Sequence, residues 1–286
     1  MVHFLKKVLK DKLTDIEISK LYSSFDIIGE IAIIKIPESI EEKKEIIGNS
    51  LMDNIKNVKS VFSQSSPVRG EFRIRDLELI AGKDQTITYY KEHGCIFKVD
   101  VRNTYFSPRL STERIRISNL ISDDKLQNQK DVVINMFGGV GTYSIIIAKK
   151  NPQCIVYNID SNIHAHVLCQ ENAKLNKVEN RVFSIFGDAK DVINSNLSNT
   201  ANRVLMPLPE KAHEFIDEAV LSLYNRTGII HYFSHVAAKN KKDVIPEVEK
   251  DNELKFKSYL IDLFNITVVR EVGPRIYQVV SDIKVM

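Results

Sequence analysis

The feature that most constrains the fold of this chain is an apolar strand that runs directly into a glycine-rich turn and a helix. The stretch from Asp131 to Lys150 reads DVVINMFGGVGTYSIIIAKK, and a second apolar segment, CIVYNID, ends at Asp160. This order is typical of a nucleotide-binding βαβ unit, in which glycines let the backbone approach the ligand and the acidic residue binds ribose hydroxyls. The sequence therefore predicts a parallel sheet with a nucleoside-type ligand at its edge.

The glycine pattern narrows the choice of ligand. The turn reads Gly138-Gly139-Val140-Gly141, which does not match the G-x-G-x-x-G run of dinucleotide enzymes. An adenosyl ligand without a pyrophosphate needs fewer backbone donors, so we expect S-adenosylmethionine as the cofactor. For Asp160, the alternative to ribose binding is an N-cap on the helix that starts near Asn162.

Composition limits the class of protein. The 286 residues suit two domains of ordinary size, and 43% of them are hydrophobic. No run approaches the roughly 18 apolar residues of a membrane span, and lysines stand where a signal peptide needs an apolar core. We therefore expect a cytoplasmic monomer without membrane association. The three cysteines lack metal-ligand spacing, so we expect no metal site. A net charge of +3 permits nucleic acid as a partner without demanding it.

Residues 1–108 are predicted to form a small α+β domain that binds RNA or substrate. The isoleucine-rich segment 26–37 predicts one strand that ends at a proline. The other predicted elements are a helix over 38–56, short strands over 58–62 and 72–79, and a hairpin over 85–101 that turns at His93-Gly94.

Residues 109–286 are predicted to form an α/β domain of the Rossmann-like methyltransferase class. Strands alternate with helices, which implies a parallel sheet with helices on both faces. The expected strands are 131–137, 155–159, 181–186, 202–206 and 228–233. The last two strands, 264–272 and 275–285, are joined tightly at Gly273-Pro274. They predict a C-terminal β-hairpin, which is the arrangement of S-adenosylmethionine methyltransferases.

In such sheets, ligands bind beyond the carboxyl ends of the strands. Those ends carry Phe137-Gly138-Gly139, Asp160, Gly187-Asp188 and Pro207-Leu208-Pro209, and we expect these segments to converge on one crevice. Asp188 is a candidate acceptor for the adenine amino group, with a plain turn residue as the alternative. The two prolines fix the backbone where the transferred methyl group should lie, with a rigid strand terminator as the alternative.

A second dense segment, YFSPRLSTERIR, precedes the sheet. If a helix starts after Pro108, then Arg109, Glu113 and Arg116 fall on one face by i,i+4 and i,i+3 spacing. A solvated ion-pair face is the alternative. Arginines beside aromatic side chains suit contact with splayed single-stranded bases. Another basic cluster, in the first domain, comprises Arg69, Arg73 and Arg75.

Together these segments resemble the archaeal and eukaryotic tRNA (guanine-37) N1-methyltransferases and the related enzymes of the wyosine pathway. The resemblance covers nearly the whole chain, and its segments stand in the family order. They are GEFRIRDLELIAG, DVRNTYFSPRLSTERIRIS, INMFGGVGTYSI, NIDSN, AKLNKVENRV, NRVLMPLPEKAHEFID and VREVGPRIYQVVSDI. The string YFSPRLSTER is specific, whereas the glycine loop alone is not.

The resemblance implies an enzyme that uses S-adenosylmethionine to methylate guanosine N1 at tRNA position 37. By this resemblance Glu113 is the general base for the N1 proton, Arg73 stabilises charge on guanine O6, and Tyr105 lies near the cofactor and the base. Pro207 stands at a further catalytic position. The residues expected to bind the cofactor are Phe137, Gly138, Gly139, Gly141, Ile159, Asp160, Asp188, Ala189 and Arg109.

One departure from the family pattern bears on the substrate. The family's Asn-Leu-Pro is Pro207-Leu208-Pro209 here, so the amide expected to position the base is missing. C7 of a tricyclic wyosine precursor is therefore an alternative acceptor. Transfer of the aminocarboxypropyl group is disfavoured, because that branch usually alters the SPRL string.

Two further classes remain as alternatives. One is a tRNA-binding protein that has lost catalysis, and the other is a small-molecule methyltransferase, which the separate arginine-bearing first domain disfavours. We also expect the chain to lack a small N-terminal domain that some family members use on the tRNA elbow. The anticodon stem-loop of tRNA is therefore the expected partner.

Overall fold

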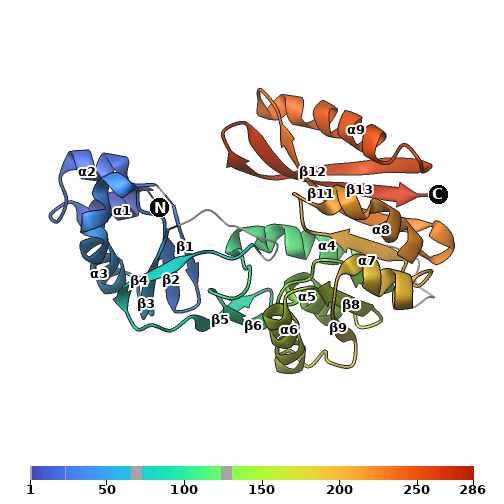
Figure 1. Ribbon diagram of the computed structural model, residues 1–286, viewed down its shortest axis with the longest axis horizontal. Coiled ribbons are helices and arrows are strands. Elements are labelled where there is room, and N and C mark those ends of the chain that lie inside the picture. The colour runs from blue at the N-terminus through green and yellow to red at the C-terminus, as the bar shows by residue number, and fades with distance from the viewer. Residues whose placement is uncertain (1, 23, 66–72, 124–130) are drawn as a thin grey trace. The chain divides into compact units, whose positions relative to one another are not determined.

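A computed structural model describes residues 2–22, 24–65, 73–123 and 131–286. The chain divides into two compact units, Met1–Arg109 and Leu110–Met286, which run from blue to cyan and from green to red in Figure 1. Each unit contains a β-sheet and a buried apolar core of its own. Across the described residues, none of the helices has the length and apolar content that a membrane crossing requires.

The first unit is a mixed sheet with helices packed on it. Helix α3 (Lys44–Asn54) contacts the strands β3 (Ser60–Gln64) and β4 (Leu77–Gly82) as well as the N-terminal helix α1 (Val2–Leu9). Together these elements bury a cluster that includes Leu9, Ile34, Leu51 and Val61. The sheet has the order β1 (Phe25–Ile28), β2 (Ile31–Ile34), β3 (Ser60–Gln64) and β4 (Leu77–Gly82), with β2 and β3 parallel and the other neighbours antiparallel. The remaining elements are α1 (Val2–Leu9), α2 (Asp15–Lys20), η1 (Glu38–Lys43), α3 (Lys44–Asn54), β5 (Ile87–Glu92) and β6 (Cys95–Asp100).

The segment 26–37, predicted to be one strand, is instead a tight antiparallel pair. β1 and β2 are joined through Gly29 and Glu30. Gly29 has φ +56°, and a Cβ atom there would lie 2.4 Å from the carbonyl oxygen of Tyr89. Glu30 N–H also donates to Thr88 Oγ1 (2.9 Å). The turn is therefore set by the close approach of β5, a contact between distant residues that the run of isoleucines does not reveal.

The other predictions for this unit hold in part. The hairpin over 85–101 is confirmed, because β5 pairs with β6 and Glu92 lies opposite Cys95 on either side of the His93-Gly94 turn. The helix predicted from residue 38 starts as the 3₁₀ turn η1 and becomes α-helical at Lys44. β4 begins only at Leu77, and Phe72, where its strand was predicted to start, lies outside the described residues.

The second unit is built on a larger sheet with the order β12-β13-β11-β10-β7-β8-β9. The five strands β11, β10, β7, β8 and β9 are parallel to one another, whereas β13 is antiparallel to both β11 and β12. Its strands are β7 (Val132–Asn135), β8 (Ile155–Asp160), β9 (Val182–Phe186), β10 (Arg203–Met206), β11 (Gly228–Ala237), β12 (Ile261–Gly273) and β13 (Ile276–Val285). This confirms the predicted α/β methyltransferase fold with its C-terminal hairpin, β12–β13.

Helices cover this sheet and connect its strands. Helices α5 (Thr142–Lys150) and α6 (Ile163–Leu175) contact β8, and α4 (Ser111–Asp123) packs against α5. Helix α9 (Val244–Lys255) contacts β11, β12 and β13. The longer helices are α4 (Ser111–Asp123), α5 (Thr142–Lys150), α6 (Ile163–Leu175), α8 (Ile216–Ser222) and α9 (Val244–Lys255), and shorter turns include η2 (Pro108–Leu110), α7 (Ala189–Val192), η3 (Ile193–Leu197) and η4 (Ala212–Phe215).

The strand order places the ligand site. From β7 the chain proceeds outward to β8 and β9, then returns to the other side of β7 to form β10 and β11. The carboxyl ends of β7 and β10 therefore lie at the topological switch point, where open parallel sheets bind their ligands.

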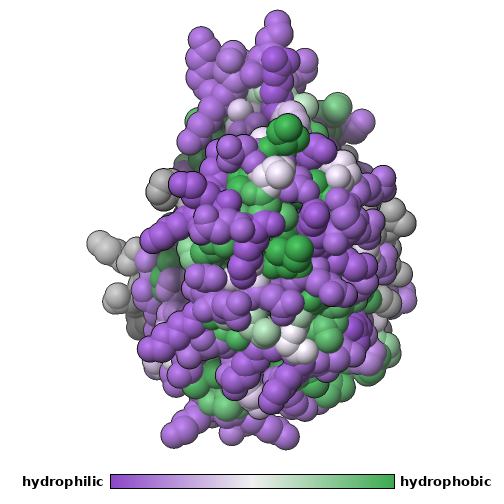
Figure 2. All heavy atoms as spheres, turned by 90° about the vertical axis from the view of Figure 1, so that its left-hand side faces the viewer, coloured by the Kyte–Doolittle hydropathy of each residue, from purple (hydrophilic) through white to green (hydrophobic). Residues whose placement is uncertain are grey.

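Figure 2 shows one face of the molecule, on which hydrophilic side chains predominate and hydrophobic ones are scattered among them. Single exposed apolar side chains are ordinary on a protein surface.

Candidate active site

The glycine loop after β7 is fixed to the end of β8 by backbone geometry. Gly138 N–H donates to the carbonyl oxygen of Ile159 (2.8 Å). A Cβ atom on Gly138 would lie 2.1 Å from Asn158 Oδ1. At Gly141, where φ is +87°, it would lie 2.7 Å from Cys169 Sγ. Both positions therefore require glycine because the loop packs directly on neighbouring side chains.

Asp160 ends β8 beside this loop, as predicted for the ribose ligand. Its Oδ2 accepts from Gly139 N–H (2.7 Å) and its Oδ1 from Asn162 N–H (2.9 Å). Burial raises the pKa of Asp160, and these two backbone hydrogen bonds oppose the rise. The N-cap of α6 is Asn162, whose side chain accepts from His164 N–H, so the N-cap alternative for Asp160 is wrong. An ionised carboxylate oxygen accepts more than one hydrogen bond, so acceptor capacity remains for hydroxyl groups.

A buried polar network, which the sequence did not indicate, lies under the glycine loop. Asn135 Nδ2 donates to Ser144 Oγ (3.1 Å), and Ser144 Oγ donates to Asn158 Oδ1 (2.6 Å). Asn158 Nδ2 in turn donates to the carbonyl oxygen of Gly139 (3.4 Å). Asn135 and Asn158 are paired across β7 and β8. An asparagine at the end of β7 and another inside the apolar run of β8 were the available signal.

Four other predicted cofactor residues also lie in the second unit. Asp188 is the N-cap of α7, and its side chain accepts from Lys190 N–H (2.8 Å). Phe137 is partly exposed and packs edge-on against Phe215, with ring centroids 4.9 Å apart. Ile159 and Ala189 belong to the buried core of the second unit. Their roles toward a cofactor stay predictions.

Pro207 follows the last residue of β10 and opens a compact loop. Leu208 N–H donates to the carbonyl oxygen of Met206 (2.9 Å), and Leu208 accepts at its own carbonyl from Lys211 (3.0 Å) and Ala212 (2.8 Å) N–H groups. The loop is thus a rigid connection from β10 into η4, with Pro207 and Leu208 partly exposed at the switch point.

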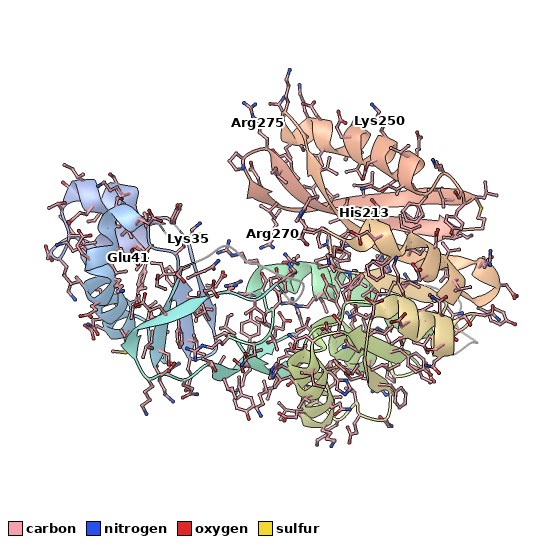
Figure 3. The ribbon with its side chains drawn as sticks, viewed as in Figure 1. Lys35, Glu41, His213, Lys250, Arg270 and Arg275 are labelled. Carbon is pink, nitrogen blue, oxygen red and sulfur yellow. The ribbon has the colours of Figure 1, made fainter. Side chains whose placement is uncertain are left out.

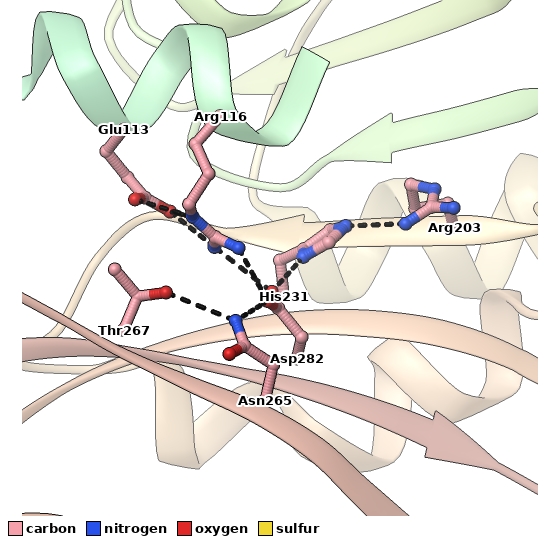
Figure 4. Close-up of polar contacts among 7 residues, drawn as sticks. All are labelled: Glu113, Arg116, Arg203, His231, Asn265, Thr267 and Asp282. Atoms are coloured by element: carbon pink, nitrogen blue, oxygen red, sulfur yellow. Dashed lines mark hydrogen bonds and ion pairs between the residues drawn. The ribbon is translucent and has the colours of Figure 1, made fainter. Parts of the chain in front are cut away.

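Glu113 belongs to a buried network of charged side chains in the second unit (Figure 4). It is only 3% exposed. Arg116, one turn further along α4, binds the Glu113 carboxylate through Nε (2.8 Å) and Nη2 (2.6 Å). The same guanidinium binds Asp282 of β13 through Nη1 (2.6 Å). Arg116 therefore lies between two carboxylates, only one of which the sequence indicated.

His231 and Arg203 continue the network into the sheet. His231 Nδ1 lies 2.5 Å from Asp282 Oδ1, and Arg203 Nη1 lies 2.8 Å from His231 Nε2. Because arginine only donates, Nε2 accepts and the ring proton lies on Nδ1, where it is donated to Asp282. Burial lowers the pKa of His231 to about 4, against the hydrogen bond to Asp282. The imidazole is therefore neutral at physiological pH.

Burial also sets the proton affinity of Glu113. Desolvation raises the pKa of Glu113, the hydrogen bonds and charge of Arg116 lower it, and the negative charge of Asp282 raises it. Desolvation wins, so the net shift is upward from the ordinary value of 4.5. A buried carboxylate with raised proton affinity is what a general base requires.

The candidate residues of the first unit make contacts within that unit. The guanidinium of Arg73 lies over the Tyr105 ring, 4.2 Å from its centroid. Arg75 and Arg109 both bind Asp26, at 3.4 Å and 2.8 Å. Arg109 lies in the 3₁₀ turn before α4 and pairs with Asp26, so the prediction that it shares a helix face with Glu113 and Arg116 is wrong. Arg69 lies outside the described residues.

Comparison with known proteins identifies the family. The model of the TRM5/TYW2 methyltransferase domain matches residues 88–257, which is more than half of the chain, and the model of the TYW2 N-terminal domain matches residues 5–86. The chain belongs to the TRM5/TYW2 family. Its members are S-adenosylmethionine-dependent transferases that act on tRNA position 37, and solved relatives hold adenosyl ligands. The predicted cofactor is thereby confirmed, and the glycine loop with Asp160 fits an adenosyl group.

Relatives with different products are similar to this TRM5/TYW2 chain. It is 39% identical to tRNA (guanine(37)-N(1))-methyltransferase Trm5b of Pyrococcus abyssi, over 93% of this chain and 76% of that protein. It is 32% identical to tRNA 4-demethylwyosine(37)-methyltransferase Taw21 of Saccharolobus solfataricus, over 92% of this chain and 94% of that protein. A solved complex of aTrm5 with tRNALeu matches with a TM-score of 0.82 and 33% identity, covering 99% of this chain and 78% of that one.

Replacing Asp160 with alanine should weaken S-adenosylmethionine binding by about tenfold to a hundredfold, because hydrogen bonds to a charged acceptor contribute about 1.5–3 kcal/mol. Isothermal titration calorimetry measures the effect. Asp191→Ala, on the exposed first turn of α7, is the matched control and should bind like the wild type. Wild-type affinity in Asp160→Ala would remove this residue from the cofactor site.

Proposed function

We propose that this protein transfers a methyl group from S-adenosylmethionine to N1 of guanosine at tRNA position 37. The observation that carries the proposal is Glu113, a buried carboxylate with raised proton affinity in the segment SPRLSTER. The similarity to Trm5b, at 39% identity over 93% of the chain, supports the same assignment.

The chemistry requires such a base. Guanine N1 carries a proton at neutral pH and is a poor nucleophile, so Glu113 would remove this proton as the N–CH₃ bond forms. Negative charge then develops on O6, where a fixed guanidinium stabilises the transition state. Arg73, held over the Tyr105 ring, is the candidate for that guanidinium.

The chain's own residues would bind and orient the cofactor. Asp160 would accept from the ribose hydroxyls, the backbone at Gly138 and Gly139 would line the ligand, and Asp188 would lie toward the adenine. When bound, S-adenosylmethionine supplies an electrophilic methyl group on a sulfonium that leaves as a neutral thioether. The protein holds the two reactants in line.

Exposed basic side chains support tRNA as the substrate. Lys250 on α9 and Arg275 at the turn of the β12–β13 hairpin are exposed and lie at the surface of the second unit in Figure 3. Such side chains bind phosphates, and their binding weakens as salt rises. The anticodon stem-loop as the bound part, the cytoplasmic location and the monomeric state stay predictions.

A second candidate acceptor is C7 of a tricyclic wyosine precursor at position 37. Proline at position 207 has no side-chain amide, whereas the family pattern has asparagine there. A group suited to binding guanine is therefore missing. The match of residues 5–86 to the TYW2 N-terminal domain and the similarity to Taw21 also favour this candidate. A base is needed in either reaction, because C7 also loses a proton.

The acceptor is tested by transfer of labelled methyl from S-adenosylmethionine to three tRNAs. One carries G37, one carries A37, and one carries the tricyclic intermediate. We expect label on the tRNA with G37 and none on the tRNA with A37. After digestion, the label should be found as a methyl group on N1 of guanosine. Label on the tricyclic base alone would identify C7, and not guanine N1, as the acceptor. No label on any of the three tRNAs would favour a binding protein.

Replacing Glu113 with glutamine should lower turnover by about a hundredfold or more, the usual contribution of a general base, while cofactor affinity is unchanged. In the wild type, the rate should fall as the pH drops through the Glu113 pKa, which lies above 4.5, because only the ionised carboxylate accepts the proton. Single-turnover rates across pH measure both effects. The control is Glu253→Gln on the exposed face of α9, and wild-type rates in Glu113→Gln would exclude Glu113 as the base.

A further inference from the structure

Arg116 divides its donors between two carboxylates. Its Nε and one N–H of Nη2 bind Glu113, at 2.8 Å and 2.6 Å, whereas Nη1 binds Asp282 at 2.6 Å and Nη2 also reaches it at 3.2 Å. A planar guanidinium presents these donors in a fixed fork. The position of Asp282 therefore fixes the plane in which Arg116 holds Glu113.

Asp282 is itself held from the far side. It is fully buried, and Asn265 Nδ2 donates to its Oδ2 (2.7 Å) while His231 Nδ1–H donates to its Oδ1 (2.5 Å). Although burial raises the pKa of Asp282, the hydrogen bonds from His231, Arg116 and Asn265 hold it well below its ordinary range. These hydrogen bonds therefore favour the ionised form of Asp282.

The charged and titratable side chains around Glu113 lie on α4, β13, β11 and β10. Arg116 of α4 and Asp282 of β13 act on its carboxylate directly. The neutral His231 of β11 and the positive Arg203 of β10 act behind Asp282. α5, which packs on α4, carries its basic residues Lys149 and Lys150 in its last turn, where they bind Asn176 and Asn119.

A guanidinium shared by two carboxylates stabilises each of them less than it would stabilise one alone. Without the charge of Asp282, Arg116 would pair with Glu113 alone and would favour its ionised form more strongly. The carboxylate would then be a weaker base. A base that is too weakly basic gives a poor proton-transfer driving force.

We propose that Asp282 is a positioning residue for the reaction: it binds one side of the Arg116 fork, so that Arg116 orients Glu113 while it shares its charge between two carboxylates. This inference rests on the proposed function, in which Glu113 is that base. Asp282 itself touches no reacting atom in this account.

The test compares two variants that should move the pH profile in opposite directions. Asp282→Asn removes the charge, so kcat should fall about tenfold and the acid limb of the single-turnover profile should move to lower pH, with KM for tRNA and cofactor unchanged. Asn265→Ala, at an exposed position, removes a donor from Asp282 and leaves its charge less compensated. The acid limb of Asn265→Ala should therefore move to higher pH, and this second variant carries the test if Asp282→Asn fails to fold.

Asp262→Asn, an exposed aspartate on β12, is the matched control and should leave rate and profile unchanged. A merely structural role for Asp282 predicts lower stability with an acid limb that does not move in either variant, and that result would overturn the inference. Glu113→Gln, measured in the same experiment, separates a failure of the proposed function from a failure of the inference about Asp282. Full turnover in Glu113→Gln overturns the base and this inference together, whereas an inactive Glu113→Gln with unmoved limbs overturns the inference alone.

Discussion

The buried charge network of the second unit depends on one shared guanidinium. Arg116 binds Glu113 on its own helix and Asp282 on the C-terminal hairpin, so a local pair on α4 is joined to a strand 166 residues away in the chain. The two carboxylates of this network are balanced by the two guanidinium groups of Arg116 and Arg203, and leaving a buried carboxylate unpaired would cost far more. The C-terminal hairpin is therefore part of the candidate catalytic machinery as well as of the fold.

The cofactor side of the site depends on a different kind of contact. There the backbone of the glycine loop rests on Asn158, and Ser144 joins Asn158 to Asn135 on the neighbouring strand. Neutral side chains that are hydrogen-bonded to one another fix the loop, as buried polar groups usually are. The loop and Asp160 are thus held by the protein's own contacts, so the free energy of binding a ligand there need not order them.

The sequence predicted the features that depend on local pattern and on strand order. These are the glycine loop, Asp160 at the end of β8 and the C-terminal hairpin, which follow from apolar runs and from the glycine, aspartate and proline residues that end them. Asp282 and His231 were missed because a single polar residue inside an apolar strand has no pattern of its own, and its partner is known only once the strands are paired. The turn at Gly29 was missed for the same reason, since the approach of β5 creates it.

The most direct test of this account is a titration of Glu113 by carboxyl ¹³C NMR on protein labelled at glutamate, with Glu113→Gln used to assign the signal. The account predicts that this resonance titrates above 4.5, the ordinary value for glutamate, and that it moves toward lower pH in Asp282→Asn. A Glu113 signal that titrates at or below the ordinary value in the wild type would contradict the claim that burial and the shared guanidinium hold a basic carboxylate.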